Sequence, residues 1–104
     1  MKRYLSEQEK IQIYEDIRAY LAEELEIDPE KITDETNIIE DLGADSILFL
    51  EMFEEFKGRL GIELEIRTIG QYMLNNPVYT FKEITQSIYM FVEKGEDLIQ
   101  EMEQ

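Results

Sequence analysis

Apolar residues recur every three or four positions over much of this chain, the spacing that places them on one face of an α-helix. Ser6 and Glu9 form a capping-box pattern ahead of the first such run, which predicts a helix of about five turns. Asp28-Pro29 should close it, because the residue before proline is pushed away from helical geometry. The apolar positions of this helix are Ile13, Tyr14, Ile17, Leu21 and Leu25.

Residues 28–45 lose this periodicity and are largely polar, which predicts a long loop. A long loop in a small domain either serves function or shows that the elements have been misassigned. Several apolar residues indicate that this loop is pinned to the core; they are Ile32, Ile38, Ile39 and Leu42.

A second helix is expected from Ser46 to about Leu60. At 100° per residue its aromatic side chains fall within one narrow stripe, which is more typical of a core face than of a cofactor site, and the opposite side is mostly polar. The stripe holds Phe49, Phe53, Phe56 and Leu60, and the opposite side holds Ile47, Glu51, Glu54 and Gly58.

Two further helices are expected in the second half of the chain. Residues 62–66 alternate like a β-strand but have no convincing partner strand, so they are interpreted as an extended connector. A short third helix then ends by Asn75, before Pro77. Thr80 and Glu83 form a second capping box, and Gly95 is a natural stop for the last helix. The apolar positions of these helices are Ile66, Ile69 and Met73, then Ile84, Ile88 and Phe91.

This element order predicts an all-α fold, a small irregular four-helix bundle with a long loop between the first and second helices. Residues 1–94 form the bundle in this interpretation, and residues 95–104 form a C-terminal extension. We expect the extension to be frayed or loosely docked, because its only apolar residues are Leu98, Ile99 and Met102.

Charge narrows the classes of partner. The chain has 25 acidic and 10 basic residues, a formal net charge of −15 that repels nucleic acid and anionic membranes and favours basic protein surfaces. Disorder is the competing interpretation, but 43% of residues are hydrophobic and fall at helical spacing. The N-terminal residues lack the apolar core of a signal peptide and no run approaches a membrane span, so a cytoplasmic protein is expected.

The chain contains neither cysteine nor histidine. Disulfides, thiolate metal sites and cysteine nucleophiles are therefore excluded, and the usual general base is missing. Any reactive thiol must be supplied by another molecule. An enzyme is the least favoured class, because no set of residues converges on a reaction centre.

The stretch Asp41-Leu42-Gly43-Ala44-Asp45-Ser46-Ile47 joins the loop to the second helix. It predicts a tight turn at Gly43 and a helix N-terminus that either Asp45 or Ser46 caps. Together with the glutamates that follow it, the stretch resembles the acyl carrier proteins of fatty-acid synthesis. In that family, the serine of an Asp-Ser-Leu signature carries a 4′-phosphopantetheine arm, and members also place a long loop before it.

The resemblance implies that a phosphopantetheinyl transferase moves the arm from coenzyme A onto Ser46, and that the arm then holds acyl groups as thioesters. Asp45 would help to present the serine, although helix capping explains this residue equally well. The protein would be a monomeric carrier and a substrate of enzymes. Acyl-transfer enzymes and enzymes of fatty-acid or polyketide synthesis would bind, through basic surfaces, to Asp41, Ile47, Glu51, Glu54 and Glu55.

Carriers of this family can also fold an acyl chain between the second and third helices. Phe49 stands where the family usually has a smaller polar residue, so it could either line such a pocket or plug it. Lys57 and Arg59 fall where the family's second helix is often acidic, which fits a specialised carrier as well as a general one. The pocket candidates are Phe49, Phe53, Phe56, Ile69 and Met73.

Three other interpretations stay open at this point. A polyketide-type carrier would share the same serine. An acidic helical interaction module would use Ser46 only as a helix cap. A calcium-binding protein would suit the many carboxylates, but no twelve-residue loop places oxygen ligands at alternate positions with glycine sixth and glutamate last.

Overall fold

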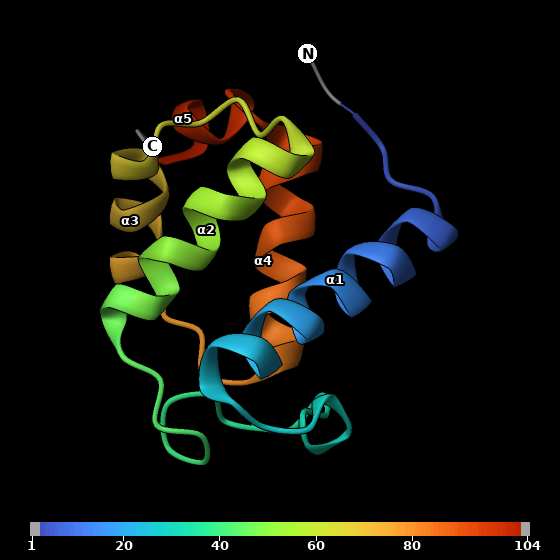
Figure 1. Cartoon of the computed structure of the whole chain (residues 1–104). Coiled ribbons are helices and arrows are strands. Elements are labelled where there is room, and N and C mark those ends of the chain that lie inside the picture. Colours follow the sequence, from blue (N-terminus) through green and yellow to red (C-terminus); the bar gives the residue numbers. More distant parts are fainter. Residues whose placement is uncertain (1–2, 103–104) are drawn as a thin grey trace.

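The computed structural model describes residues 3–102, and within them every regular element is helical. The all-α prediction is therefore confirmed, with a short fifth helix added to the expected four (Figure 1). The elements are α1 (Glu7–Leu25), the 3₁₀ turn η1 (Pro29–Lys31), α2 (Ser46–Leu60), α3 (Ile66–Asn75), α4 (Phe81–Lys94) and α5 (Asp97–Met102).

Both capping boxes form as predicted. At the start of α1, the Ser6 hydroxyl accepts a hydrogen bond from the Glu9 amide at 3.1 Å, and the Ser6 amide donates to the Glu9 carboxylate at 3.0 Å. Thr80 and Glu83 repeat this exchange at the start of α4. These reciprocal bonds satisfy amide groups that a helix start otherwise leaves unpaired.

The predicted end of α1 is wrong by a few residues. The helix stops at Leu25 because Glu26 adopts the left-handed conformation, with φ of 55°, and its amide donates back into the last turn. Asp28-Pro29 instead begins η1, where the Asp28 carboxylate accepts a hydrogen bond from the Glu30 amide at 2.9 Å. Proline suits this position because it has no amide hydrogen to leave unpaired.

The long loop is anchored to the core and to α4. Ile32 and Ile38 are fully buried, as predicted, and Leu42 is partly buried. The prediction is wrong for Ile39, whose side chain is 43% exposed. Ile39 lies in a turn in which its amide donates to the Asn37 side chain, and the turn points Ile38 rather than Ile39 into the core.

A short set of backbone hydrogen bonds joins this loop to the entry of α4. Asn37 and Thr80 form an isolated antiparallel bridge, the Ile38 amide donates to the Tyr79 carbonyl at 3.0 Å, and the Phe81 amide donates to the Thr36 carbonyl at 2.9 Å. These bonds therefore hold residues 36–38 of the loop against the start of α4.

The helices enclose one hydrophobic core. α2 packs against both α1 and α3, and α4 packs against α1 (Figure 1). Edge-to-face aromatic pairs link these helices, including Tyr14 with Phe81 at 4.8 Å and Tyr20 with Phe56 at 5.8 Å between ring centres. The connector between α2 and α3 forms no regular element, and its Ile62 and Leu64 side chains are buried.

The expectation of a frayed or loosely docked C-terminal turn is wrong for residues 97–102. These residues form α5, whose Leu98 is only 2% exposed and belongs to the core. Lys94 and Glu101 add an ion pair of 2.8 Å between α4 and α5. None of the helices in the described part of the chain is long and apolar enough to cross a membrane.

Candidate functional site

Ser46 is the first residue of α2, and its side chain is exposed. Asp45, not Ser46, caps the helix: its carboxylate accepts a hydrogen bond from the Leu48 amide at 2.9 Å. Within residues 3–102, the Ser46 hydroxyl makes no hydrogen bond of its own. The choice that the sequence left open is therefore settled, and the serine oxygen is not committed to the helix start.

The turn before Asp45 sets the direction in which α2 begins. Gly43 has a φ of 75°, which side chains rarely tolerate, and its amide donates to the Ile39 carbonyl at 2.9 Å. The Ala44 amide donates to the Ile38 carbonyl at 3.1 Å, and the Asp41 carboxylate accepts from the Asn37 amide at 2.9 Å. Asp41 is exposed, so its carboxylate both closes this turn and faces solvent.

A cleft of 480 Å³ opens beside Ser46, between α2, α3 and the segment that leads into α4. Its volume falls within the range of small-molecule pockets, about 300–1,000 Å³. Nearly all of its lining is apolar, so the space suits a hydrocarbon better than a polar ligand. The lining residues are Ile39, Ser46, Phe49, Leu50, Phe53, Ile69, Gly70, Met73, Leu74, Pro77, Val78 and Tyr79.

Most of the pocket candidates named from the sequence line this cleft. Phe49, Phe53, Ile69 and Met73 do so, and Phe49 stands along the wall without filling the space. Phe56 does not line the cleft: it lies in the core, packed edge to face on Tyr20 of α1. Phe56 shares the stripe of Phe49 and Phe53 on α2, so its position about one turn beyond Phe53, rather than its direction, keeps it out of the cleft.

Sequence reasoning missed the residues at the mouth of the cleft. Leu50, Leu74 and Tyr79 are large, at least partly apolar and exposed, with Leu74 exposed to 82%. Leu50 stands one helical turn after Ser46, a spacing that could have identified it. Leu74 and Tyr79 flank Pro77 in a connection whose path the sequence pattern does not reveal.

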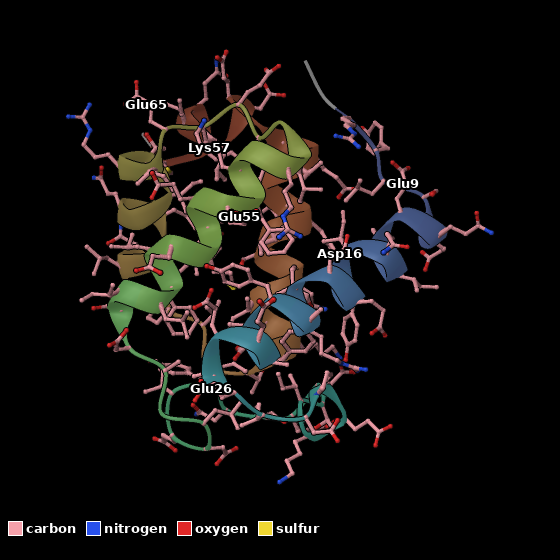
Figure 2. The ribbon with its side chains drawn as sticks, viewed as in Figure 1. Glu9, Asp16, Glu26, Glu55, Lys57 and Glu65 are labelled. Atoms are coloured by element: carbon pink, nitrogen blue, oxygen red, sulfur yellow. The ribbon has the colours of Figure 1, made fainter. Side chains whose placement is uncertain are left out.

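The solvent-facing side of α2 is acidic near Ser46. Glu51, Glu54 and Glu55 are exposed, and Ile47 is 63% exposed among them. Glu55 also forms an ion pair with Arg59 at 2.7 Å, which neutralises part of its charge. Figure 2 labels Glu55 and Lys57 on α2; Lys57 and Arg59 are the basic residues of its last turn, so the charge along the helix changes sign toward the C-terminal end.

The negative charge on this side of α2 affects the pKa of Tyr20. Burial raises the pKa of the Tyr20 hydroxyl, and the carboxylates of Glu24, Glu51 and Glu55 raise it further. The acidic residues of α1 and α2 therefore act together on the surface between the two helices.

Comparison with known proteins identifies the family. Residues 15–77, more than half of the chain and with Ser46 among them, match the family model described as the phosphopantetheine attachment site. The chain belongs to the acyl carrier protein family. It is 28% identical over 96 residues to an acyl carrier protein homolog of Clostridium acetobutylicum, an alignment that spans 92% of this chain and 93% of that protein.

Two shorter alignments support this assignment to the acyl carriers. An acyl carrier protein of Helicobacter pylori strain G27 is 36% identical over 52 residues, which span 50% of this chain and 67% of that protein. An acyl carrier protein of Wolinella succinogenes is 33% identical over 64 residues, 56% of this chain and 84% of that protein.

The surroundings of Ser46 fit the phosphorylated arm of an acyl carrier. The first turn of α2 contains no acidic residue, and the N-terminus of a helix carries a partial positive charge. Free backbone amides at such a terminus can donate hydrogen bonds to the oxygens of a phosphate group. The basic residues in the last turn, Lys57 and Arg59, complement the opposite end of the helix dipole.

The residues that the structure describes contain no candidate cation site. Within residues 3–102, no three carboxylates come together in an arrangement that could hold a metal ion. The calcium-binding interpretation therefore gains no geometric support from the described residues.

Proposed function

We propose that this protein carries acyl groups as thioesters on a 4′-phosphopantetheine arm attached to the Ser46 oxygen. The observation that supports this most directly is an exposed serine that begins α2 while its neighbour Asp45 supplies the cap. A serine that served only as a cap would occupy the position that Asp45 holds. The interaction-module interpretation thus loses the role it assigned to Ser46.

A phosphopantetheinyl transferase would transfer the arm from coenzyme A to the Ser46 oxygen. The serine oxygen loses its proton and forms a phosphoester bond with the arm as the pyrophosphate bond of coenzyme A breaks, and the adenosine bisphosphate half of coenzyme A leaves. The arm supplies a terminal thiol for thioester formation, a group that this cysteine-free chain cannot provide. The chain's own part is to expose the serine, to stabilise the nearby negative charge at the start of α2, and to present a surface that enzymes recognise. In this proposal the protein is a substrate of enzymes and has no catalytic centre.

Partner enzymes would approach the acidic side of α2. Glu51 and Glu54 offer exposed carboxylates beside the small apolar contact of Ile47, and Asp41 and Asp45 extend the charge toward the loop. Charges of this kind steer encounters with basic surfaces more than they add lasting affinity, which suits a carrier that must dissociate. Glu55 contributes less, because Arg59 already pairs with it. A monomeric carrier with partners of the fatty-acid type is the form we favour, with polyketide-type partners as the alternative.

We further propose that the cleft beside Ser46 shelters the acyl chain. Burial of apolar surface stabilises by about 0.8 kcal/mol per methylene group. The cleft lies open at its mouth, where Leu74 and Tyr79 are exposed, so the chain can leave it when an enzyme binds the thioester. Phe49 acts in this proposal as part of the wall.

The attachment is tested by incubating the protein with coenzyme A and a broad-specificity phosphopantetheinyl transferase, followed by intact-protein mass spectrometry. We expect the wild-type protein to gain the mass of one phosphopantetheine and Ser46→Ala to gain none. Ser6→Ala is the matched control, because Ser6 is also an exposed serine beside a helix start, and it should be modified fully. An unmodified wild-type protein beside a modified reference carrier would disprove the proposal.

A further inference from the structure

The cleft beside Ser46 ends at a wall of aromatic side chains. Phe53 lines its inner end, and the Phe53 ring packs edge to face on Phe91, with 5.9 Å between ring centres. Tyr72 also packs edge to face on Phe91, with 5.6 Å between ring centres, and the Tyr72 hydroxyl lies 3.5 Å from the Met90 sulfur. α2, α3 and α4 each contribute to this wall.

The position of the wall follows from which residues line the cleft. Phe53 and Ile69 are the lining residues farthest along α2 and α3 from the Ser46 end. Phe56, the next core residue of α2, and Ile66, in the first turn of α3, do not reach it. The space beyond Phe53 is therefore filled by side chains.

Displacing this wall to admit a longer ligand would cost free energy. Phe91 is fully buried and Phe53 nearly so, and on the side away from the cleft a close-packed interior leaves no free volume into which a ring could turn. The edge-to-face contacts would also be lost on opening, and these add to the stabilisation that burial provides. A chain longer than the cleft must leave its excess carbons in solvent.

The depth of the cleft, from Ser46 to the wall, can be estimated from the rise per residue of α2. Ser46 and Phe53 are seven positions apart, which corresponds to about 10 Å along α2. An extended acyl chain advances about 1.3 Å per bond, by analogy with the protein backbone, in which three bonds span about 3.8 Å. About eight carbons therefore fit between the mouth and the wall.

We propose that Phe53 sets the length of acyl chain that this carrier shelters, with a limit near eight carbons. This inference rests on the proposed function, since it assumes that an acyl group is attached through Ser46. It specifies the cargo as short- to medium-chain acyl groups, because longer chains would expose apolar surface to water and to other proteins. Phe53 is then a specificity-determining residue.

The test is a thermal-unfolding series on the full chain. The transferase is supplied with acetyl-, butanoyl-, hexanoyl-, octanoyl-, decanoyl- or dodecanoyl-coenzyme A, and loading is verified by intact mass. Each fully buried methylene should raise the Tm by about 3–6 °C, and a partly buried one by less. We expect the Tm of the wild-type protein to rise up to octanoyl and then to stay level.

Phe53→Leu and Phe56→Leu form a matched pair for this series. Both remove part of a buried ring from α2, so both should lower the Tm of the unloaded protein. Only Phe53→Leu opens the end of the cleft, so its Tm should continue to rise through decanoyl and dodecanoyl. Phe56→Leu should level off at octanoyl, as the wild-type protein does.

The possible failures are distinct from one another. Absence of any mass gain on the wild-type protein would refute the proposed function itself. A loaded wild-type protein whose Tm rises steadily to dodecanoyl, or does not change with chain length, would overturn the limit set by Phe53 while leaving the attachment intact. The same holds if Phe53→Leu levels off with the wild type. If Phe53→Leu no longer unfolds cooperatively, the dependence of the wild-type Tm on acyl-chain length alone tests the eight-carbon limit.

Discussion

Asp45 has two proposed roles that one pair of substitutions can separate. Its carboxylate caps α2 through the Leu48 amide, and the same carboxylate stands exposed next to Ser46, where a transferase must approach. Asp45→Ala removes both the cap and the charge. Asp45→Asn keeps an oxygen that can cap the helix and removes only the charge, because asparagine is as good an N-cap as aspartate.

The expected effects on stability follow from this geometry. Loss of an N-cap acceptor costs about 1 kcal/mol, and a domain of this size loses about 4–8 °C of Tm for each kcal/mol. Asp45→Ala should therefore lower the Tm by about 4–8 °C. Asp45→Asn should lose less than about 1 kcal/mol, since only the interaction of an exposed charge with the helix dipole is removed.

The transferase assay then tests the second role. Initial rates of arm transfer are compared at equal carrier concentration and at a temperature well below both unfolding transitions. If the carboxylate helps to present Ser46 to a basic surface, the initial rate of arm transfer should be at least about threefold lower for both variants than for the wild-type protein. A wild-type rate for Asp45→Asn would refute this reasoning and leave Asp45 as a cap alone.

Three other properties can be tested in the same way. The hydrogen bonds from the Thr80 and Tyr79 amides lower the pKa of the Glu83 carboxyl in the folded protein. The stability that the ionised Glu83 contributes is therefore present above its pKa in the unfolded chain and is lost as the pH falls through its pKa in the folded protein. Glu83→Gln should flatten the dependence of Tm on pH in that window. Glu54→Lys should slow arm transfer at low salt, and Glu96→Lys, at an exposed position before α5, should not. Tyr14→Phe, which removes the 2.7 Å bond to Asp34 in the long loop, should cost about 1–2 kcal/mol in denaturant unfolding; an unchanged midpoint would show that this bond does not stabilise the loop.

Local signals made much of this fold predictable. The two capping boxes and Asp45 each specify a helix start through side chains within three residues of it, so the sequence alone locates α1, α2 and α4. The helical spacing of apolar residues likewise predicts which face of each helix is buried. These features depend on neighbours in sequence, which a sequence pattern records directly.

Features that depend on distant contacts could not be predicted. Glu26 ends α1 in a left-handed conformation, and the sequence could not predict this because that position usually holds glycine or asparagine. The exposure of Ile39 depends on how the loop pairs with residues 79–81, and the burial of Leu98 depends on how α5 docks. Whether Phe49 lines or fills the space between α2 and α3 depends on the spacing of those helices. The family resemblance indicated several lining residues, but the open space of the cleft and its mouth were therefore visible only in the structure.

The most direct test of the carrier role is the mass of the protein as its native cell makes it. Intact-protein mass spectrometry, followed by fragmentation of the peptide that contains Ser46, should find phosphopantetheine, free or acylated, on the Ser46 oxygen. Native protein that carries no such group, or carries it on Ser6 or Ser87, would contradict the account.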